Sequence, residues 1–441
     1  MEAEEFVRGS FLENAPIVAV SSTIGTGLPE LHTFLEKIAS EIEPKDGSRH
    51  PRLPIDRAFS LRGFGTVVTG TLLAGCVAPG LELEVHPLGR RVRVRGVQVH
   101  GDAVERAFAG QRAALNLAGI ETPELARGMV LTPPGCFRPT QLVDANFHLF
   151  VSAGPLKHRT PIHFYTGSTE QPTEARLLSG LAPVEPGGSA YVRFLLHEPL
   201  LVLPGDRFIV RRSSPAVTIG GGVVIDITPP AKRKRAELAA RLSVLESGTL
   251  AGRISLFVRE SRWGLGMPDL VARTGLPEHE IESFSPDASL LLYREPRFWL
   301  LNRDWAARTT DGFRALVAAF HREHPLSPGM PKEELRSRAL TGAPPFLLDA
   351  LLAAAADLTA EGETVRLLSH KPSTTLEEEN ALRNMESAFL FAGLASPATN
   401  DVLAASGLAS ARARSLLQLL TRNQTLVRLA DDLLLHCAAL A

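Results

Sequence analysis

The residue pattern of this chain changes abruptly at Pro229–Pro230. Before this point, from Pro54 to about Thr228, short β-rich runs such as RRVRVRGVQVH and SAYVRFLLHE alternate with Gly and Pro turns every ~8 to 12 residues, which is typical of antiparallel barrels or sandwiches. After it, Leu, Ala, Glu and Arg recur at helical spacing. A chain of 441 residues that contains both patterns is expected to form several domains.

Two antiparallel β-barrels are predicted in the β-rich part, because one arrangement of strands occurs twice. Residues 110–131 and residues 187–210 each contain a strand followed by a second strand that is entered through an R-G or a P-G-D turn. The segment PPGCFRP, residues 133–139, separates the two copies. We therefore expect one barrel over 50–135 and another over 138–230.

The helical part contains three blocks, each of which ends in a short β-like ribbon. The ribbons are expected at residues 290–302, 362–370 and 424–436. Helices followed by a β-hairpin, repeated at ~65 to 70 residues, are typical of tandem α+β winged-helix modules. The predicted modules span 233–303, 305–370 and 375–441.

The first 46 residues are expected to contain one strand followed by one helix. Pro16–Val20 is apolar and β-branched, and apolar residues then recur at helical spacing from Leu28 to Ile42. A parallel strand needs neighbouring strands and helices on both faces, so a single βα unit cannot cover its own apolar strand. We therefore expect further residues before Met1, and a linker from Glu43 to Pro54.

Composition narrows the class of partner. The 47 basic and 48 acidic residues give a net charge of -1, so no overall field favours nucleic acid or membranes. No run approaches ~18 apolar residues and the N-terminus is acidic, which predicts a cytoplasmic protein with no membrane partner. The three cysteines are far apart and the histidines complete no familiar spacing, so no metal site is expected.

Motifs for catalysis are missing from the sequence. No G-x-x-x-x-G-K-[ST] loop, D-x-x-G or N-K-x-D motif is present, and no Ser/His/Asp or Cys/His constellation can be assembled. We therefore predict no catalytic residues and no GTP hydrolysis by this chain on its own.

One strand carries a row of positive charge. RRVRVRGV places Arg91, Arg93 and Arg95 on one face and Val92 and Val94 on the other, because side chains alternate along a strand. The solvated face of a sheet and a nucleic-acid contact are both compatible with this pattern, and the first is slightly favoured.

Four passages resemble a known family. LPIDRAFSLRGFGTVVTGTLLAG and VRVRGVQVHGDAVERAFAGQRAALNLAG are similar to the second domain of translational GTPases. TIGGGVVIDITPPAKRKR and FHREHPLSPGMPKEELRSR resemble the third-domain exit and the second winged helix of the selenocysteine-specific elongation factor family. The resemblance implies GTP-dependent delivery of selenocysteinyl-tRNA to the ribosome at recoded UGA codons. It makes residues 1–46 the end of a GTPase domain and implies that a last winged-helix module, which binds the selenoprotein mRNA hairpin, is missing.

The resemblance also implies site residues. Ser21, Ser22 and Thr23 match the last guanine-contacting motif of the GTPase domain, where the complete family uses GTP and Mg²⁺. The alternative is a helix entry capped by hydroxyls. The tRNA backbone would contact the run Lys157, His158 and Arg159, through charge and without sequence information.

The aminoacyl pocket implied by the resemblance consists of Asp56, Arg57, Phe59, His100 and Arg112. Selenocysteine is an anion near neutral pH and serine is neutral, so cationic side chains in a shielded pocket would favour the selenolate. The alternative is that Asp56 and Arg57 form a surface ion pair and that Arg112 is a solvated charge. At the level of the whole chain, a tRNA- or ribosome-binding adaptor without a nucleotide switch and a winged-helix DNA regulator are the alternatives.

Overall fold

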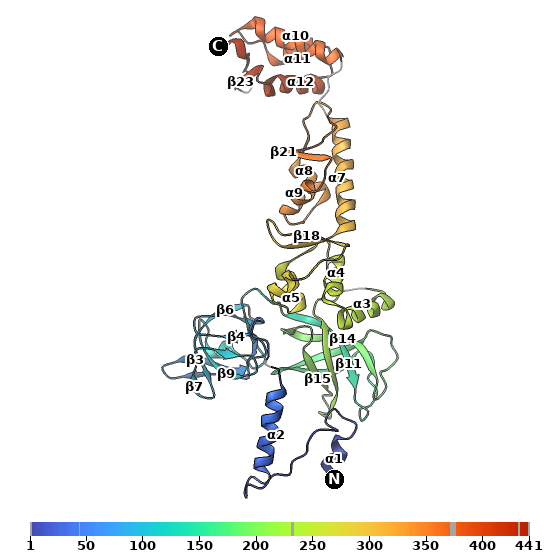
Figure 1. The fold of residues 1–441 in the computed structure, drawn as a ribbon. Helices are drawn as coiled ribbons and strands as arrows, with labels where there is room; N and C mark the ends of the chain where they lie inside the picture. Colours follow the sequence, from blue (N-terminus) through green and yellow to red (C-terminus); the bar gives the residue numbers. More distant parts are fainter. Residues whose placement is uncertain (1, 44, 231–232, 371–375, 431–432, 440–441) are drawn as a thin grey trace. The chain divides into compact units, whose positions relative to one another are not determined.

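The computed structural model describes residues 2–43, 45–230, 233–370, 376–430 and 433–439. They form two compact units, of which the first comprises residues 1–248 and 267–284 and the second comprises residues 249–266 and 285–441. Figure 1 shows two β-rich bodies in the first unit and mainly helices in the second. No described helix is both long and apolar enough to cross a membrane.

The N-terminal residues contain two helices. α1 spans Glu2–Val7, and α2 spans Leu28–Glu41 and agrees with the expected helix. The predicted strand Pro16–Val20 is wrong, since these residues have no regular secondary structure and pair with no strand in the described part of the chain. A strand is stabilised by hydrogen bonds to a neighbour, and the apolar run has no such neighbour here.

The first β domain is an eight-stranded antiparallel sheet with a small two-stranded sheet beside it. The main sheet has the order β1-β10-β5-β6-β9-β3-β2, with β7 paired to β6, and β4 pairs with β8. The strands are β1 (Leu53–Pro54), β2 (Arg57–Leu61), β3 (Gly65–Thr71), β4 (Cys76–Val77), β5 (Glu82–His86), β6 (Arg90–Val99), β7 (Asp102–Ala103), β8 (Ala107–Phe108), β9 (Arg112–Ala118) and β10 (Val130–Thr132), with a 3-10 turn at Thr122–Glu124.

This sheet curls so that its edge strand β1 approaches β3. A Cβ atom added to Gly70 would lie 2.1 Å from the carbonyl oxygen of Pro54, so only glycine allows this approach. Val92 and Val94 of β6 are buried inside the curled sheet, as the alternation predicts. The outer face of the same strands is therefore left for polar side chains and ligands.

The second β domain is a closed six-stranded barrel with strand order β11-β14-β13-β12-β15-β16. Its strands are β11 (Thr140–Leu149), β12 (Thr160–Thr166), β13 (Thr169–Leu177), β14 (Ser189–Leu200), β15 (Arg207–Arg211) and β16 (Thr218–Asp226). Four phenylalanines fill the interior, with ring centroids of Phe164 and Phe208 4.8 Å apart and those of Phe194 and Phe208 5.1 Å apart. Gly222 lets β16 approach β11, because an added Cβ would lie 1.9 Å from the carbonyl oxygen of Asn146.

Specific contacts connect the two β domains. Arg52 donates two hydrogen bonds to Asp206, from Nη1 to Oδ2 at 2.7 Å and from Nη2 to Oδ1 at 2.6 Å. The hydroxyl of Ser168 donates to the carbonyl of Ile55 at 2.8 Å. Bidentate Arg–carboxylate pairs fix orientation as well as distance, so these contacts align the two domains within the first unit.

A buried cluster of four charges attaches α3 (Arg235–Ser247) to the barrel. Asp226 and Arg241 form an ion pair of 2.7 Å and are 3% and 2% exposed. Asp144 lies directly opposite Asp226 on β11 and pairs with Arg193 at 2.6 Å. Burial raises the pKa of Asp144, while the hydrogen bond from Arg193 acts in the opposite direction.

Three sets of helices with a β-hairpin follow the barrel. The first contains α3, α4 (Leu250–Glu260), β17 (Leu265–Gly266), α5 (Met267–Thr274), α6 (Glu278–Glu282), β18 (Leu290–Tyr293) and β19 (Trp299–Asn302). The second contains α7 (Arg303–Glu323), β20 (Met330–Pro331), α8 (Lys332–Ala339), α9 (Phe346–Ala353), β21 (Leu358–Glu361) and β22 (Thr364–Leu367). The third contains α10 (Leu376–Ala392), α11 (Thr399–Ala405), α12 (Ser410–Arg422), β23 (Leu426–Ala430), β24 (Leu433–His436) and a 3-10 turn at Cys437–Ala439.

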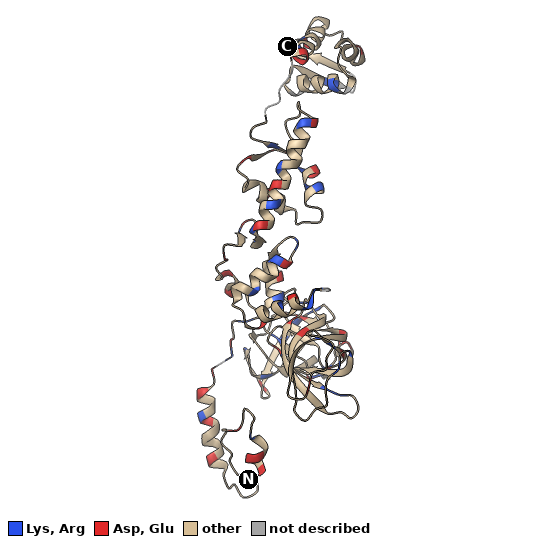
Figure 2. Ribbon diagram, turned by 90° about the vertical axis from the view of Figure 1, so that its right-hand side faces the viewer, with Lys and Arg blue, Asp and Glu red and all other residues tan. Residues whose placement is uncertain are grey.

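The hairpins agree with the winged-helix prediction, with one shift. β18–β19 and β23–β24 lie within the predicted ribbons, whereas the second hairpin begins at Leu358, four residues before its predicted start at 362. The turn at Gly362 joins its strands, so that glycine marks the middle of the hairpin. Figure 2 shows acidic and basic residues interspersed along the helices of the second unit.

The three tryptophans of the chain all lie in the second unit. The indole N–H of Trp299 donates to the carbonyl of Trp263 at 2.8 Å, and the rings of Trp263 and Trp305 meet edge to face at 5.8 Å. Trp299 also contacts Phe346, with centroids 5.2 Å apart. These rings join the hairpin β18–β19 to the apolar core of the second helical set.

Candidate functional site

Strand register brings the predicted pocket residues to one region of the first β domain. β2 pairs with β3, β3 with β9, and β9 with β6, so the four strands are contiguous. Arg57 begins β2, and Arg112 begins β9 opposite Thr71 at the end of β3. His100 follows Val99, which pairs with Ala113, and therefore lies level with Arg112. The three cationic or titratable side chains thus share one end of the sheet.

The central contact of this region is an ion pair between Arg112 and Asp56. Arg112 Nη1 lies 2.6 Å from Asp56 Oδ2, and the two side chains are 55% and 31% exposed. The backbone N–H of Asp56 donates to Thr69 O at 2.7 Å, which fixes the carboxylate at the start of β2. The sequence suggested Arg57 as a possible partner of Asp56, but Arg57 makes no ion pair in the described part of the chain. The guanidinium of Arg112 has five N–H donors, and most of them remain for a ligand.

His100 occupies a tight turn. It and Gly101 connect β6 to β7 with φ angles of 55° and 95°, as a two-residue hairpin of type I′ requires. The turn geometry therefore accounts for the left-handed backbone of a non-glycine residue. It also holds the imidazole, which is exposed, at the same end of the sheet as Arg112.

Phe59 lines a cavity of about 340 Å³ on the outer face of these strands. Sequence reasoning missed the other residues of the cavity, although Gln98 and Asn116 share the outward alternation of Phe59 across the paired strands. The lining comprises Phe59, Leu61, Phe64, Val67, Pro79, Gly96, Val97, Gln98, Ala103, Val104, Ala114 and Asn116.

Two polar atoms beside this cavity lack a protein partner. Asn116 Oδ1 and Thr69 Oγ1 are buried and form no hydrogen bond with the residues that the structure describes. A buried polar atom without a partner costs free energy, and a ligand group can supply the missing bond. The cavity thus combines aromatic and aliphatic walls with a few polar atoms, which is typical of small-molecule sites.

The three residues predicted to contact the tRNA backbone have different surroundings. Lys157 is exposed. Arg159 is also exposed and lies 3.4 Å from Glu174. His158 Nδ1 accepts the backbone N–H of Leu177 at 3.1 Å, so this imidazole supports the barrel. Lys157 and Arg159 remain candidates for phosphate contacts, whereas the bond made by His158 is structural.

Ser21, Ser22 and Thr23 lie in the turn before α2. The Ser21 N–H donates to Thr26 O at 3.0 Å, and its carbonyl accepts from Gly25 N at 2.9 Å. None of the three caps the helix, because the N-cap residue is Gly27 in the left-handed region. The hydroxyl-cap alternative is therefore wrong, and the predicted guanine contact stays a prediction.

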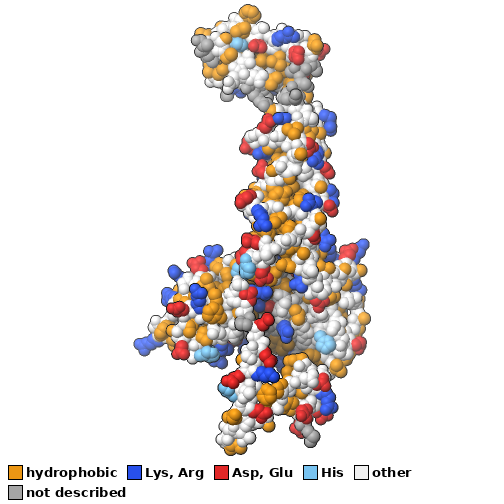
Figure 3. Space-filling view, in the orientation of Figure 1, with side chains coloured by type: hydrophobic (Ala, Val, Ile, Leu, Met, Phe, Trp, Pro, Cys, Tyr) orange, Lys and Arg blue, Asp and Glu red, His pale blue; other side chains and the backbone are white. Residues whose placement is uncertain are grey.

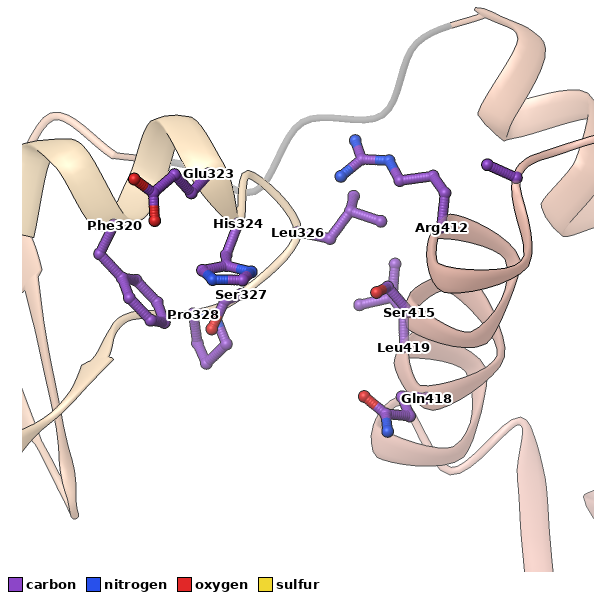
Figure 4. A pocket seen from close by; sticks show the side chains of 11 residues that line it. Phe320, Glu323, His324, Leu326, Ser327, Pro328, Arg412, Ser415, Gln418 and Leu419 are labelled. Atoms are coloured by element: carbon purple, nitrogen blue, oxygen red, sulfur yellow. The ribbon is translucent and has the colours of Figure 1, made fainter. Parts of the chain in front are cut away.

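A further cavity of about 500 Å³ lies in the second unit (Figure 4). Phe320 and His324 of the α7 end lie on one side, and Gln418 and Leu419 of α12 line it as well. None of the predicted site residues lines it. Among the residues described, no three His, Cys, Asp or Glu side chains are grouped so that they could hold a metal ion.

Three of these domains match models of known protein families. Family models match residues 65–132, as "Elongation factor Tu domain 2", residues 144–231, as "Selenocysteine-specific elongation factor, beta-barrel domain", and residues 314–367, as "Elongation factor SelB, winged helix". The class defined by these domains is that of translation elongation factors.

Relatives specify the family. The chain is 34% identical to the selenocysteine-specific elongation factor of Desulfomicrobium baculatum, over 98% of this chain and 69% of that protein. The Haemophilus influenzae protein of the same name is 28% identical, over 77% of this chain and 53% of that protein. A crystal structure of a bacterial selenocysteine-specific elongation factor has the same fold, with a TM-score of 0.69 at 20% identity, covering 99% of this chain and 69% of that one. The chain belongs to the selenocysteine-specific elongation factor family.

Proposed function

We propose that this chain binds selenocysteinyl-tRNA and presents it to the ribosome at recoded UGA codons. The observation that carries the proposal is the convergence of Arg57, His100 and Arg112 beside the cavity lined by Phe59. A selenolate placed there would be attracted by the guanidinium of Arg112. The neutral hydroxyl of serine would gain much less, so the site would discriminate by charge.

The cavity beside the cationic side chains suits the nucleotide that carries the amino acid. An aminoacyl group at Arg112 is attached to the terminal adenosine of the tRNA, and that base is planar and largely apolar on its faces. Phe59 and Val67 offer apolar walls, while Gln98 and Asn116 offer polar atoms to the base edge. This pairing of an anion site with a base-sized cavity supports aminoacyl-tRNA over a free amino acid as ligand.

GTP and Mg²⁺ belong to the GTPase domain of the family. The residues present do not fit these groups, because the sequence contains no phosphate-binding loop and Ser21–Thr23 alone offer no phosphate ligand set. The second candidate function is therefore a tRNA-binding adaptor without a nucleotide switch. Salt-sensitive tRNA binding by this chain that does not respond to GTP would favour that candidate.

The described residues of α12 offer few free cations for an mRNA hairpin. Helix α12 carries Arg412 and Arg414, but Arg412 is paired with Glu378 of α10. A recognition helix that binds nucleic acid uses several free cations. The partners that we propose are therefore tRNA and the ribosome, and the location is the cytoplasm, where translation takes place.

The discriminating experiment compares two aminoacyl-tRNAs. We would measure protection of the ester bond from hydrolysis for selenocysteinyl-tRNA and for its seryl precursor, with the wild-type chain and with Arg112→Ala. Loss of a hydrogen bond to a charged group costs about 1.5–3 kcal/mol, so the variant should bind selenocysteinyl-tRNA roughly 10- to 100-fold more weakly. Seryl-tRNA binding should change much less.

Arg90→Ala is the matched control. Arg90 is 54% exposed and pairs with Glu124 at 3.2 Å, so it closely resembles Arg112 in exposure and charge environment. This variant should leave the ratio of the two affinities unchanged. Equal losses for both tRNAs in Arg112→Ala would reject the charge-selective pocket.

A further inference from the structure

Three arginines without partners among the described residues lie on a single strand of the first β domain. Arg91, Arg93 and Arg95 are exposed on β6, and none of them forms an ion pair or a side-chain hydrogen bond with the residues that the structure describes. Elsewhere in the first unit, Arg52 and Arg112 are held by carboxylates at 2.6 Å. The three arginines thus remain a local positive row on a chain whose net charge is -1.

The neighbouring strand neutralises this row only in part. Glu84 and Glu82 lie directly opposite Arg91 and Arg93 on β5. The carboxylate of Glu84, however, accepts the backbone N–H of Gly135 at 2.8 Å and is turned to that loop. Cross-strand ion pairs between Arg and Glu are common in sheets, so their absence here leaves the guanidinium groups available to an external anion.

The three arginines follow one another along β6. Arg91 pairs with β5 and Arg93 pairs with both β5 and β9, so neighbouring strands hold the backbone at these two positions. Alternate residues of a strand are about 6.6 Å apart, which is comparable with the span of one nucleotide along an extended RNA strand. A β-bulge between Val94 and Gly96 surrounds Arg95 and re-aims its side chain.

The row continues into the proposed tRNA site. Beyond the bulge, the outward residues of β6 are Gly96 and Gln98, which line the cavity, and His100 follows them. Figure 3 shows several Lys and Arg side chains on the visible face of the first β domain. A polyanion bound along β6 would therefore reach the cavity on the same outer face of the sheet.

We propose that Arg91, Arg93 and Arg95 form a binding track for the phosphodiester backbone of RNA, separate from the aminoacyl pocket. The partner class follows from the chemistry: several guanidinium groups along one strand match the repeated phosphates of a nucleic-acid backbone and carry no base specificity. The inference rests on the proposed function only in taking RNA as the polyanion. Transfer RNA and ribosomal RNA share this backbone, and the experiment distinguishes them.

The test measures the salt dependence of binding by the full 441-residue chain. The triple variant Arg91→Gln, Arg93→Gln, Arg95→Gln is titrated with deacylated tRNA, with purified small ribosomal subunits and with an RNA duplex of unrelated sequence. Each lost phosphate contact lowers the slope of log K against log salt by roughly 0.7 to 0.9. We expect the slope to fall by about 2 and the dissociation constant near 0.1 M salt to rise at least roughly tenfold.

Three further variants make the result specific. A triple variant with lysine at the same three positions keeps the positive charge and should keep the slope of log K against log salt. Glu82→Gln removes a facing carboxylate and should tighten binding. The control triple Arg336→Gln, Arg338→Gln, Arg366→Gln has the same change in net charge, but those arginines are ion-paired at 2.5–2.7 Å in the second unit. It should leave the slope unchanged.

The outcomes separate this proposal from the aminoacyl pocket. Loss of affinity for tRNA alone, or for the ribosomal subunit alone, supports the track and identifies its RNA. An unchanged slope with every RNA, in a variant whose circular dichroism matches that of the wild type, overturns it, as does an equal loss in the control triple. The track variant should weaken selenocysteinyl- and seryl-tRNA equally, whereas Arg112→Ala changes their ratio.

Discussion

Replacing Asp226 with alanine is expected to destabilise the barrel by about 3–5 kcal/mol. Asp226 and Arg241 are almost fully buried and 2.7 Å apart. Removing one partner of such a pair leaves the other charge in a low-dielectric interior, which costs about 3–5 kcal/mol. Asp226 Oδ1 also accepts the N–H of Thr228 at 2.9 Å, so the variant loses that bond as well.

The neighbouring charges predict strong coupling between the two partners. Arg241→Met alone leaves Asp226 without its cation, opposite the fully buried Asp144. This single variant should therefore be about as unstable as Asp226→Ala. The double variant removes both charges, and replacing a buried ion pair by apolar groups is often close to neutral. Most of the lost stability should return, so the coupling energy should be at least as large as the cost of one single variant, about 3–5 kcal/mol.

Scanning calorimetry of the full chain at pH 7 would measure these changes. One kcal/mol shifts the melting temperature of a 60–100-residue domain by about 4–8 °C, so Asp226→Ala should lower the barrel transition by more than about 10 °C. Glu333→Ala is the control, because Glu333 is 72% exposed and its solvent-screened pair with Arg336 should contribute little to stability. A cost below about 1 kcal/mol for Asp226→Ala, or a double variant that equals the sum of the singles, would refute the argument.

Three other predictions concern stability. Burial, and secondarily His370, lowers the pKa of His321 to about 4, below its usual 6.5. The second helical set should therefore be fully stable above about pH 6.5 and lose up to about 3 kcal/mol toward pH 4. Urea unfolding followed by circular dichroism should show that His321→Gln removes this pH dependence. Gly222→Ala should cost about 3 kcal/mol or more by calorimetry, because its Cβ would meet Asn146 O. Gly312→Ala, in open space within α7, should instead stabilise by about 0.5–1 kcal/mol, and a loss of stability would contradict the helix geometry.

Local patterns predicted much of the fold. The alternation in RRVRVRGV correctly places Val92 and Val94 in the core, because period-2 burial is visible in sequence. The apolar spacing after Leu28 correctly predicts α2. The strand at Pro16–Val20 was wrong because composition measures the tendency of a segment to pair and cannot show whether a neighbour is present. The hairpin at 358–367 was placed late because Gly362 resembled a strand boundary when it is a turn.

The candidate site was predictable only in part, because its residues come from segments that are far apart in the sequence. Arg112 and Asp56 are 56 residues apart, and their ion pair depends on the register of three strands, which the sequence does not encode locally. The cavity draws its walls from β2, β3, β6 and β9, so no single segment carries its signature. His158 was predicted to face phosphate, but a backbone N–H of the neighbouring strand occupies its Nδ1.

The confinement of tryptophan to the second unit gives the molecule an internal optical label. Trp263, Trp299 and Trp305 contact one another or the same apolar core, whereas the first unit contains only Tyr165 and Tyr191 as hydroxyl-bearing aromatic residues. Selective excitation of indole therefore reports on the hairpin β18–β19 and the second helical set, with no contribution from the β domains. RNA added to the first unit changes this emission only when the second unit responds, so one unmodified chain can be used to follow communication between its units.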